Sequence, residues 1–170
     1  MAELNVDVRL LAAGDDAAAA GAIVQQAYFA LPGYPRDDEY DVQLASVAVR
    51  AQEAQVLVAI VDGRLVGCLT YVADHHGVHA EFDDEHAAGF RYFGVDPSVQ
   101  GAGVGEAMVR WCMERARADG RERLRIHTLE SMPGAQRLYL RTGFVRDPVN
   151  DEVWDGINGL AFVYHLRGTE

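Results

Sequence analysis

One stretch of the chain constrains its fold more than any other: an apolar run that leads into a glycine-rich turn. Residues 90–95 are mostly apolar and predict a buried strand. Asp96-Pro97 ends that strand, because proline cannot donate a hydrogen bond to a sheet ladder. Three glycines then alternate with small apolar residues over 101–105, and apolar residues recur at helical spacing over 104–118. The predicted order is strand, glycine loop and helix.

The glycine loop is suited to a phosphate group. The first turn of a helix has unpaired backbone N–H groups and the positive end of the helix dipole, and glycines let an anion approach them. Two common phosphate motifs are excluded. The dinucleotide fingerprint needs a glycine where Glu106 stands, and the P-loop needs a lysine, which this chain lacks. The spacing that remains is Gln-x-x-Gly-x-Gly on Gln100, Gly103 and Gly105. An ordinary glycine-rich turn is the alternative.

The elements around the loop predict an α/β fold. Apolar β-branched runs on either side of Asp62-Gly63 predict a β-hairpin over 56–72, and the strand, helix and strand over 90–129 predict a parallel pair. The other predicted strands lie over 5–11, 144–145 and 160–166. One further helix is predicted to begin at 14–16, a second to span 42–54 and a third to begin at 132–133. Loops are predicted over 74–88 and 147–159.

The length and composition are those of a globular domain. At 170 residues the chain can build a real core, and we take residues 1–170 as one domain. No apolar run reaches membrane-spanning length, and the first residues lack the basic and apolar regions of a signal peptide. Cys68 and Cys112 lie in separate apolar stretches and predict buried thiols rather than a disulfide. These features predict a cytoplasmic protein without a membrane partner.

Charge is divided unevenly along the chain. The net charge is −11, which argues against nucleic-acid binding. Residues 1–95 contain 5 arginines and 15 acidic residues. Residues 96–146 contain 9 arginines and 6 acidic residues, and residues 147–170 contain 1 arginine and 5 acidic residues. The only positive segment is therefore the one that contains the glycine loop. A polyanionic cofactor there and a cationic substrate elsewhere would explain the division, although solvated faces also vary in charge.

The predicted loop over 74–88 is rich in histidine and acidic residues. Such clusters bind zinc or other metals where their spacing suits a coordination shell. Here no cysteine joins them and the spacing fits neither helix nor strand, so we expect a solvated loop and no metal. Because the loop immediately precedes the predicted central strand, it is placed to line a site.

The glycine loop resembles the acetyl-CoA pyrophosphate loop of the GNAT superfamily of N-acetyltransferases. A second stretch, Ala135-Gln136-Arg137-Leu138-Tyr139-Leu140-Arg141-Thr142-Gly143-Phe144, resembles that family's Ala-x-x-Leu-Tyr-x-x-x-Gly-Phe signature at the expected separation. Val95-x-Pro97 and the order of elements over essentially the whole chain are similar too. One position departs from the pattern. The family often has asparagine three residues before the alanine, where this chain has Met132, so a side-chain contact to the pantetheine arm is in doubt.

The resemblance implies a mixed, mostly antiparallel sheet of about seven strands with helices on both faces, and acetyl-CoA as co-substrate. By resemblance, the backbone of Phe93 and Val95 pairs with the pantetheine arm, and an N–H near Val95 faces the thioester carbonyl as an oxyanion donor. The residues so implied to bind the cofactor are Phe93, Gly94, Val95, Gln100, Gly101, Ala102, Gly103, Val104, Gly105 and Ala135.

Acyl transfer also needs an acid and a route for the amine's proton. Tyr139 resembles the family's general acid, and a phenol near pKa ~10 can protonate a thiolate of comparable basicity. A core aromatic is the alternative role for Tyr139. An amine with a pKa near ~10 must lose a proton before it attacks. The candidate bases are Glu39, His75, His76, His79, Glu81 and Glu85, and a water chain would serve as well, so we assign no base.

The resemblance implies transfer of an acetyl group to a primary amine, of a small molecule or of a protein N-terminus or lysine. A non-catalytic acyl-CoA-binding module is the alternative. Acidic residues gather over 36–41, 74–88 and 147–159, and we expect these segments to frame the acceptor and to favour a cationic one over an acidic one such as glutamate. We expect a monomer or homodimer.

Overall fold

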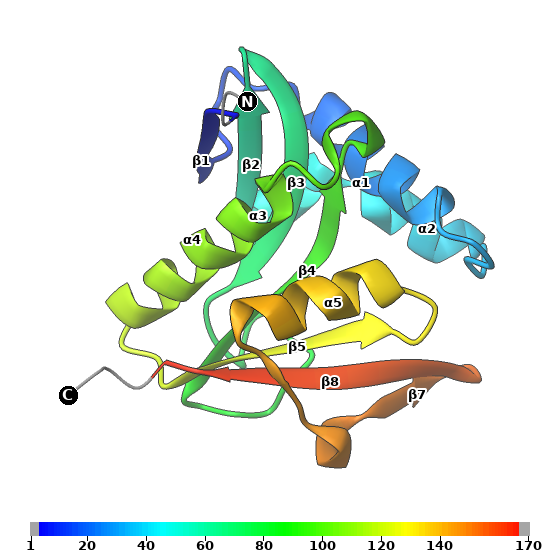
Figure 1. The fold of residues 1–170 in the computed structure, drawn as a ribbon, viewed down its shortest axis with the longest axis vertical. Coiled ribbons are helices and arrows are strands. Elements are labelled where there is room, and N and C mark those ends of the chain that lie inside the picture. Colours follow the sequence, from blue (N-terminus) through cyan, green and yellow to red (C-terminus); the bar gives the residue numbers. More distant parts are fainter. Residues whose placement is uncertain (1–3, 167–170) are drawn as a thin grey trace.

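The computed structural model describes residues 4–166 (Figure 1). In chain order its elements are β1 (Val6–Leu10), α1 (Ala17–Phe29), α2 (Asp38–Ala45), α3 (Val47–Glu53), β2 (Gln55–Val61), β3 (Arg64–Val72), β4 (Ala87–Val95), a 3-10 turn η1 (Pro97–Val99), α4 (Val104–Ala118), β5 (Arg123–Leu129), α5 (Pro133–Thr142), β6 (Val145–Arg146), a 3-10 turn η2 (Pro148–Asn150), β7 (Glu152–Trp154) and β8 (Ile157–His165).

The strands form one mixed sheet in the order β1-β2-β3-β4-β5-β8-β6, with β7 paired to β8. Every pairing is antiparallel except that of β4 with β5, which is parallel. The predicted mixed, mostly antiparallel α/β sheet is therefore confirmed, with eight strands over residues 4–166 where the sequence predicted about seven. None of the described helices combines the length and apolar character that a bilayer crossing demands.

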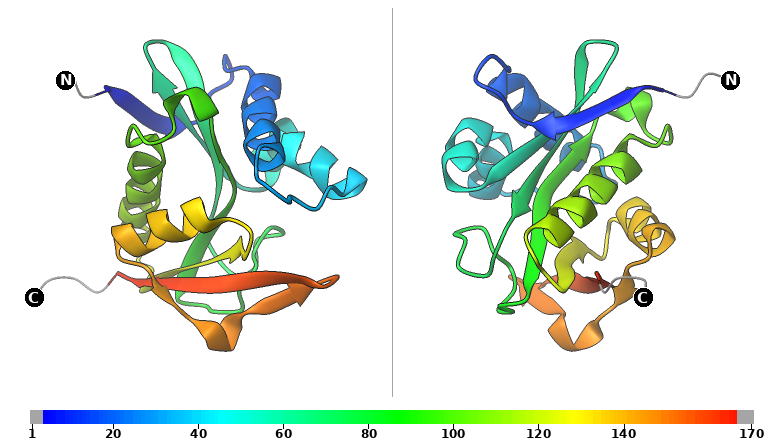
Figure 2. Two further views of the ribbon diagram at one scale, coloured as in Figure 1. Left: turned by 45° about the vertical axis from the view of Figure 1, so that its right-hand side comes forward. Right: turned by 90° about the vertical axis from the view of Figure 1, so that its left-hand side faces the viewer.

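The two faces of the sheet carry separate clusters of buried side chains. Leu57 and Ala59 of β2 pack in the cluster that α4 covers, whereas Val56 and Val58 pack in the cluster that α1, α2 and α3 cover. This alternation follows from the two-residue repeat of a strand. Figure 2 shows the strands lying between α4 on one side and α1 to α3 on the other. Helices on both faces are thus confirmed.

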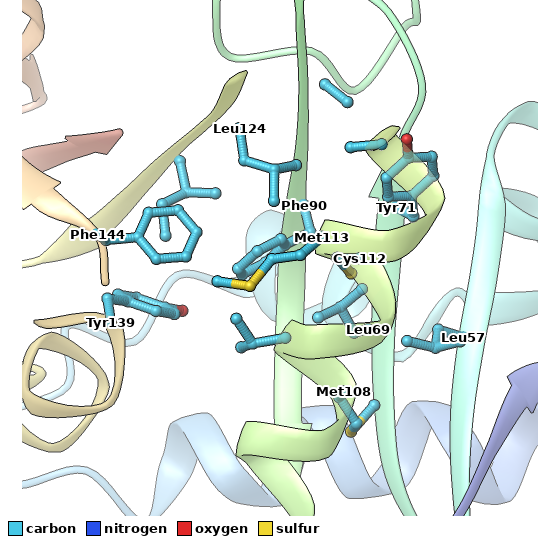
Figure 3. Close-up of a cluster of buried hydrophobic side chains, with 14 of the residues drawn as sticks. Leu57, Leu69, Tyr71, Phe90, Met108, Cys112, Met113, Leu124, Tyr139 and Phe144 are labelled. Atoms are coloured by element: carbon cyan, nitrogen blue, oxygen red, sulfur yellow. The ribbon is translucent and has the colours of Figure 1, made fainter. Parts of the chain in front are cut away.

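Helices α4 and α5 share one core. Phe90 of β4 lies with its ring centroid 5.8 Å from that of Tyr139 on α5, and Phe144, just after α5, lies 5.6 Å from Tyr139. Met113 and Cys112 of α4 are buried in the same cluster (Figure 3). The two sequence signatures, the glycine loop before α4 and the helix α5, are therefore held together by a common set of aromatic and sulfur-containing side chains.

Strand β4 is bent and only partly paired, which opens the sheet. It pairs with β5 at Ala87 and Ala88, and Figure 1 shows the two strands running apart beyond that point. Its register with β3 shifts between Cys68 and Thr70, and Tyr92 in the bulge has a φ of 52°. A β-bulge of this kind turns a strand and ends its pairing. The carboxyl-terminal half of β4 consequently keeps a free edge toward β5.

The helix predicted over 42–54 is wrong in its bounds, because α2 begins at Asp38 and a break at Ser46 separates it from α3. Ser46 has a ψ of 55°, and its hydroxyl donates to the Val42 carbonyl at 2.8 Å. The buried Arg50 guanidinium donates to the carbonyls of Gln43 and Leu44. These bonds satisfy the last carbonyls of α2, so the chain turns there instead of continuing one helix.

The loop predicted over 147–159 is wrong in part, because it contains a second hairpin. Asp155 and Gly156, with φ values of 48° and 79°, form the two-residue turn between β7 and β8. The Asp-Gly signal was present in the sequence but is flanked on one side by only three strand residues. The predicted loop over 74–88 is irregular only to His86, since β4 begins at Ala87, three residues before its predicted start. Cys68 and Cys112 are buried free thiols, as predicted.

Candidate active site

A cleft of about 1370 Å³ runs along the free edge of β4. We divide it into two ends, defined by their lining residues. The glycine-loop end is lined by residues 93–106, where they face the cleft, and by α5 residues from Gly134 to Arg141. The acidic end is lined by residues of 27–43, 80–83, Arg91, Tyr92, His127 and 152–157. The two ends meet where β4 and β5 part.

The glycine-loop end presents backbone donors without side chains in front of them. Gly101 and Gly103 have φ values of 82° and 89°, and a Cβ built on either would meet no atom within 4 Å. Gly103 is the N-cap of α4 and has no side chain, so no capping side chain occupies the first N–H groups of α4. The residues present therefore fit a phosphate or pyrophosphate, as the sequence predicted.

The free edge of β4 presents main-chain groups to the cleft. The Asp96 N–H donates to the Val66 carbonyl on β3 at 2.7 Å, so the main chain of Gly94, two residues earlier, also faces β3. Phe93 and Val95 have the opposite orientation and face the free edge. The Val95 carbonyl already accepts from the Gln100 side chain at 3.1 Å, which leaves its N–H toward the cleft. Gly94 contributes differently, because a Cβ there would lie 2.7 Å from the Val24 Cα of α1.

Helix α5 places Tyr139 against the glycine-loop end. Ala135 lines the cleft near the start of α5, and Tyr139 follows one turn later. The Tyr139 ring is buried among Phe90, Phe144 and Phe162, and its hydroxyl makes no hydrogen bond within residues 4–166. Burial raises the pKa of the Tyr139 phenol, which the sequence argument left near its usual value. The phenol consequently stays protonated, and burial makes it a weaker acid than the free phenol whose pKa matches that of a thiolate.

Glu81 is the carboxylate that the structure brings deepest into the acidic end. Its Oε1 lies 3.3 Å from the Arg91 Nε, and both side chains are 21% exposed. Burial raises the pKa of Glu81, the Arg91 and His127 charges lower it, and the Glu152 charge raises it again, with a net rise. A carboxylate with a raised pKa inside a cleft can accept a proton from a ligand.

Of the other candidate bases, only Glu39 lines the cleft. His79 binds the Glu53 carboxylate with its Nε2 at 2.6 Å, and the rings of His75 and His76 stack on each other outside the cleft. Glu85 is exposed and lies 3.1 Å from His86. Glu39 lines the cleft at the start of α2 but is exposed. Within residues 4–166, no three His, Cys, Asp or Glu side chains are grouped to hold a metal ion.

Ion pairs hold the segment that carries Glu81 over the cleft. Asp84 accepts from Arg123 and, at 2.6 Å, from the Arg125 Nε, and Arg125 also donates to Asp147 at 2.6 Å. These bonds lower the pKa of Asp84 against the effect of its burial. Segments 80–86 and 147–150 are thereby tied to the same strand, β5. Two acidic residues from the segments that the sequence suggested for substrate selection, Asp84 and Asp147, serve this structural purpose.

Sequence reasoning missed several groups that line the cleft, among them His127, Trp154, Arg137 and Arg141. His127 of β5 bonds the Asn150 carbonyl with its Nε2 at 2.9 Å, and its ring lies 5.6 Å from that of Trp154. The arginines Arg137 and Arg141 line the glycine-loop end. His127 and Trp154 had no detectable signal, since their proximity depends on the pairing of β7 with β8. Arg137 and Arg141 lie within the second signature, at its unspecified positions.

The geometry defines a protein that binds an extended, phosphate-bearing ligand along a free strand edge, next to a second, acidic pocket. A family model described as the acetyltransferase (GNAT) family matches residues 22–144. The chain therefore belongs to the GNAT family of acetyltransferases, whose members transfer an acetyl group from acetyl-CoA. No curated protein sequence matches the chain at a significant level.

Solved structures of similar fold agree with that assignment. The yncA protein of Salmonella typhimurium, solved with its cofactor acetyl-CoA, is 21% identical with a TM-score of 0.68, and the match covers 98% of this chain and 96% of that one. A GNAT family acetyltransferase from Elizabethkingia anophelis with acetyl-CoA bound is 16% identical, with a TM-score of 0.64 and coverage of 95% and 98%. A GNAT family acetyltransferase from Staphylococcus aureus is 11% identical, with a TM-score of 0.69 and coverage of 96% and 100%. At these identities the likeness shows the fold.

Proposed function

We propose that this acetyltransferase acetylates the primary amine of a small cationic molecule. One observation carries the proposal: the charge of the acidic end of the cleft. Six carboxylates line it, those of Asp37, Glu39, Glu81, Asp83, Glu152 and Asp155. Arg91 is the one arginine among the lining residues of that end, and Glu81 pairs with it. A protonated amine would be concentrated there and an anionic one repelled.

The acidic end also has aromatic walls. Tyr34, Tyr40 and Trp154 line it beside the carboxylates. Aromatic faces attract cations and pack against their alkyl chains, with a gain of about 0.5–2 kcal/mol for a well-placed cation. Carboxylates next to aromatic rings suit an organic amine better than an inorganic ion. A small molecule is favoured over a protein because these groups line a cleft and Glu81, the least exposed of the six carboxylates, lies within it.

The chain's own residues divide the chemistry as follows. Acetyl-CoA supplies an activated thioester, and Phe93 and Val95 of β4 hold its pantetheine arm through their free main-chain groups. The Val95 N–H donates to the thioester carbonyl and stabilises the charge that develops there. Glu81 accepts the proton that the acceptor ammonium must lose. As the new carbon–nitrogen bond forms and the carbon–sulfur bond breaks, Tyr139 donates its hydroxyl proton to the leaving sulfur and takes up the proton that the acylated nitrogen releases.

The test is release of free thiol from acetyl-CoA with a panel of small amines, each reaction checked for the acetylated product by mass spectrometry. We expect amines with a second positive charge to give the highest kcat/KM. Thiol release only with a peptide N-terminus or lysine would show that the acceptor is a protein. Binding of acetyl-CoA with no turnover of any amine would favour the non-catalytic module.

A further inference from the structure

Two arginines on α5 differ from the other arginines that the structure describes. Ten of those others pair with carboxylates: Arg9, Arg36, Arg64, Arg91, Arg110, Arg115, Arg117, Arg123, Arg125 and Arg146. Arg50 and Arg121 donate to backbone carbonyls. Arg137 and Arg141 make neither an ion pair nor a side-chain hydrogen bond to any residue within 4–166. Their positive charges are uncompensated there.

The two arginines lie beside the glycine loop. They are four residues apart on α5, which places them on one face of the helix, and both are exposed and line the cleft. Leu138 of the same face approaches the loop, because a Cβ at Gly105 would lie 3.2 Å from its Cδ2. The two exposed arginines therefore line the same end of the cleft as the start of α4.

Coenzyme A carries more negative charge than the glycine loop alone can balance. Coenzyme A carries a pyrophosphate and, on its ribose, a separate 3′-phosphate monoester of about −1.5 to −2 at pH 7. The glycine loop offers neutral donors only, namely backbone N–H groups and the Gln100 amide. Glu106 in the first turn of α4 is acidic and binds Arg110 at 2.8 Å, so that pair adds no net positive charge. The second phosphate needs a cation that the loop does not supply.

We propose that Arg137 and Arg141 bind the 3′-phosphate of coenzyme A and make the enzyme prefer it to 3′-dephospho-coenzyme A. The inference rests on acetyl-CoA as the co-substrate and names the residues that select it. Guanidinium groups bind phosphate oxygens through two parallel hydrogen bonds. Two like charges at this helical spacing repel each other, and a phosphate between them replaces that repulsion by attraction.

The experiment is titration calorimetry of coenzyme A and of 3′-dephospho-coenzyme A with three proteins. These are the wild type, the double variant Arg137→Ala/Arg141→Ala, and a control, Arg117→Ala/Arg121→Ala, which removes the same charge from α4 and the following turn, outside the cleft. In the wild type and the control, we expect coenzyme A to bind about tenfold or more tighter than its dephospho form. In the Arg137→Ala/Arg141→Ala protein, the ratio falls to about one, through weaker binding of coenzyme A alone.

Three results would overturn the inference: equal loss of affinity for both ligands in the α5 variant, an unchanged ratio in that variant, or a wild type that does not distinguish the ligands. If the alanine variant does not fold, Arg137→Gln/Arg141→Gln keeps the length and polarity of the side chains and answers the same question. A wild type that binds neither ligand would instead contradict the acetyl-CoA assignment on which the proposed function depends.

Discussion

The two ends of the cleft bind by opposite means. The glycine-loop end offers backbone N–H groups, an uncapped helix N-terminus and two uncompensated arginines, whereas the acidic end offers carboxylates and aromatic rings. Tyr139 lies at the first and Glu81 at the second. A polyanion and a cation can therefore occupy one cleft without competing for it. We propose that the charge of these two surfaces is what separates the two substrates.

The largest expected effect comes from a substitution that disrupts only the glycine-loop end. Gly103→Val should abolish the rise in Tm that coenzyme A causes, because the side chain would fill the space that the phosphates need and strain a residue with φ of 89°. Thermal unfolding with and without coenzyme A measures this. Gly120→Val is the matched control, since Gly120 also has a positive φ, 73°, with open space at its Cβ, at the other end of α4. It should lose similar stability and keep the response.

Tyr139→Phe should lower kcat by about two to four orders of magnitude and leave the Kd for coenzyme A unchanged, because it removes only the proton donor. Because the pKa of Tyr139 is raised, we expect no loss of activity from ionisation of Tyr139 up to about pH 10. Steady-state kinetics across pH check both points. Tyr71→Phe is the control, since that hydroxyl donates to Asp119 at 2.9 Å away from the cleft. Normal turnover in Tyr139→Phe would leave Tyr139 with a packing role only.

Glu81→Gln should lower kcat/KM by about two orders of magnitude and remove the acid limb of its pH profile. The sign follows from the role: Glu81 must be ionised to accept a proton, so activity rises with pH through its pKa. Because burial raises that pKa, the limb lies above pH ~4.3, where an unperturbed glutamate titrates. Glu85→Gln, an exposed neighbour, should behave as wild type. An unaltered limb in Glu81→Gln would point to a water chain.

The smallest expected effect is on stability, through the ion pairs that hold the acidic end in place. Asp84→Asn should cost about 1–3 kcal/mol of the free energy of unfolding at pH 7, because it weakens the bonds from Arg123 and Arg125. The pKa of Asp84 is lowered in the folded state, so its contribution is present above pH ~4 and is lost as pH falls through the lowered value. Denaturant unfolding of wild type and variant at two pH values measures this. Equal stability at pH 7 would show that the segment is held by other contacts.

The two ends also differ in how far the sequence predicted them. The glycine-loop end comes from two short stretches that resemble known motifs, so Gln100 and Gly103 could be placed in a loop and Tyr139 on a helix. The acidic end is assembled from segments that meet only through long-range strand pairing. Its acidic segments were predicted, but Asp84 and Asp147 pair with arginines of β5 whereas Glu81 pairs with Arg91 in the cleft, and no local pattern predicts that difference. The break at Ser46 depends on Arg50, whose buried side chain also donates to Thr70 of β3, a contact that no local pattern predicts.

The most direct test of the account is a matched series of acceptor amines that differ only in net charge, assayed at saturating acetyl-CoA in low and high salt. Exposed charges are screened over a Debye length of about 8 Å at physiological ionic strength. We predict that kcat/KM falls from cationic to neutral to anionic acceptors, and that salt weakens the apparent affinity of the cationic ones. If anionic amines are acetylated as well as cationic ones, with no dependence on salt, the carboxylates of the acidic end do not select the acceptor.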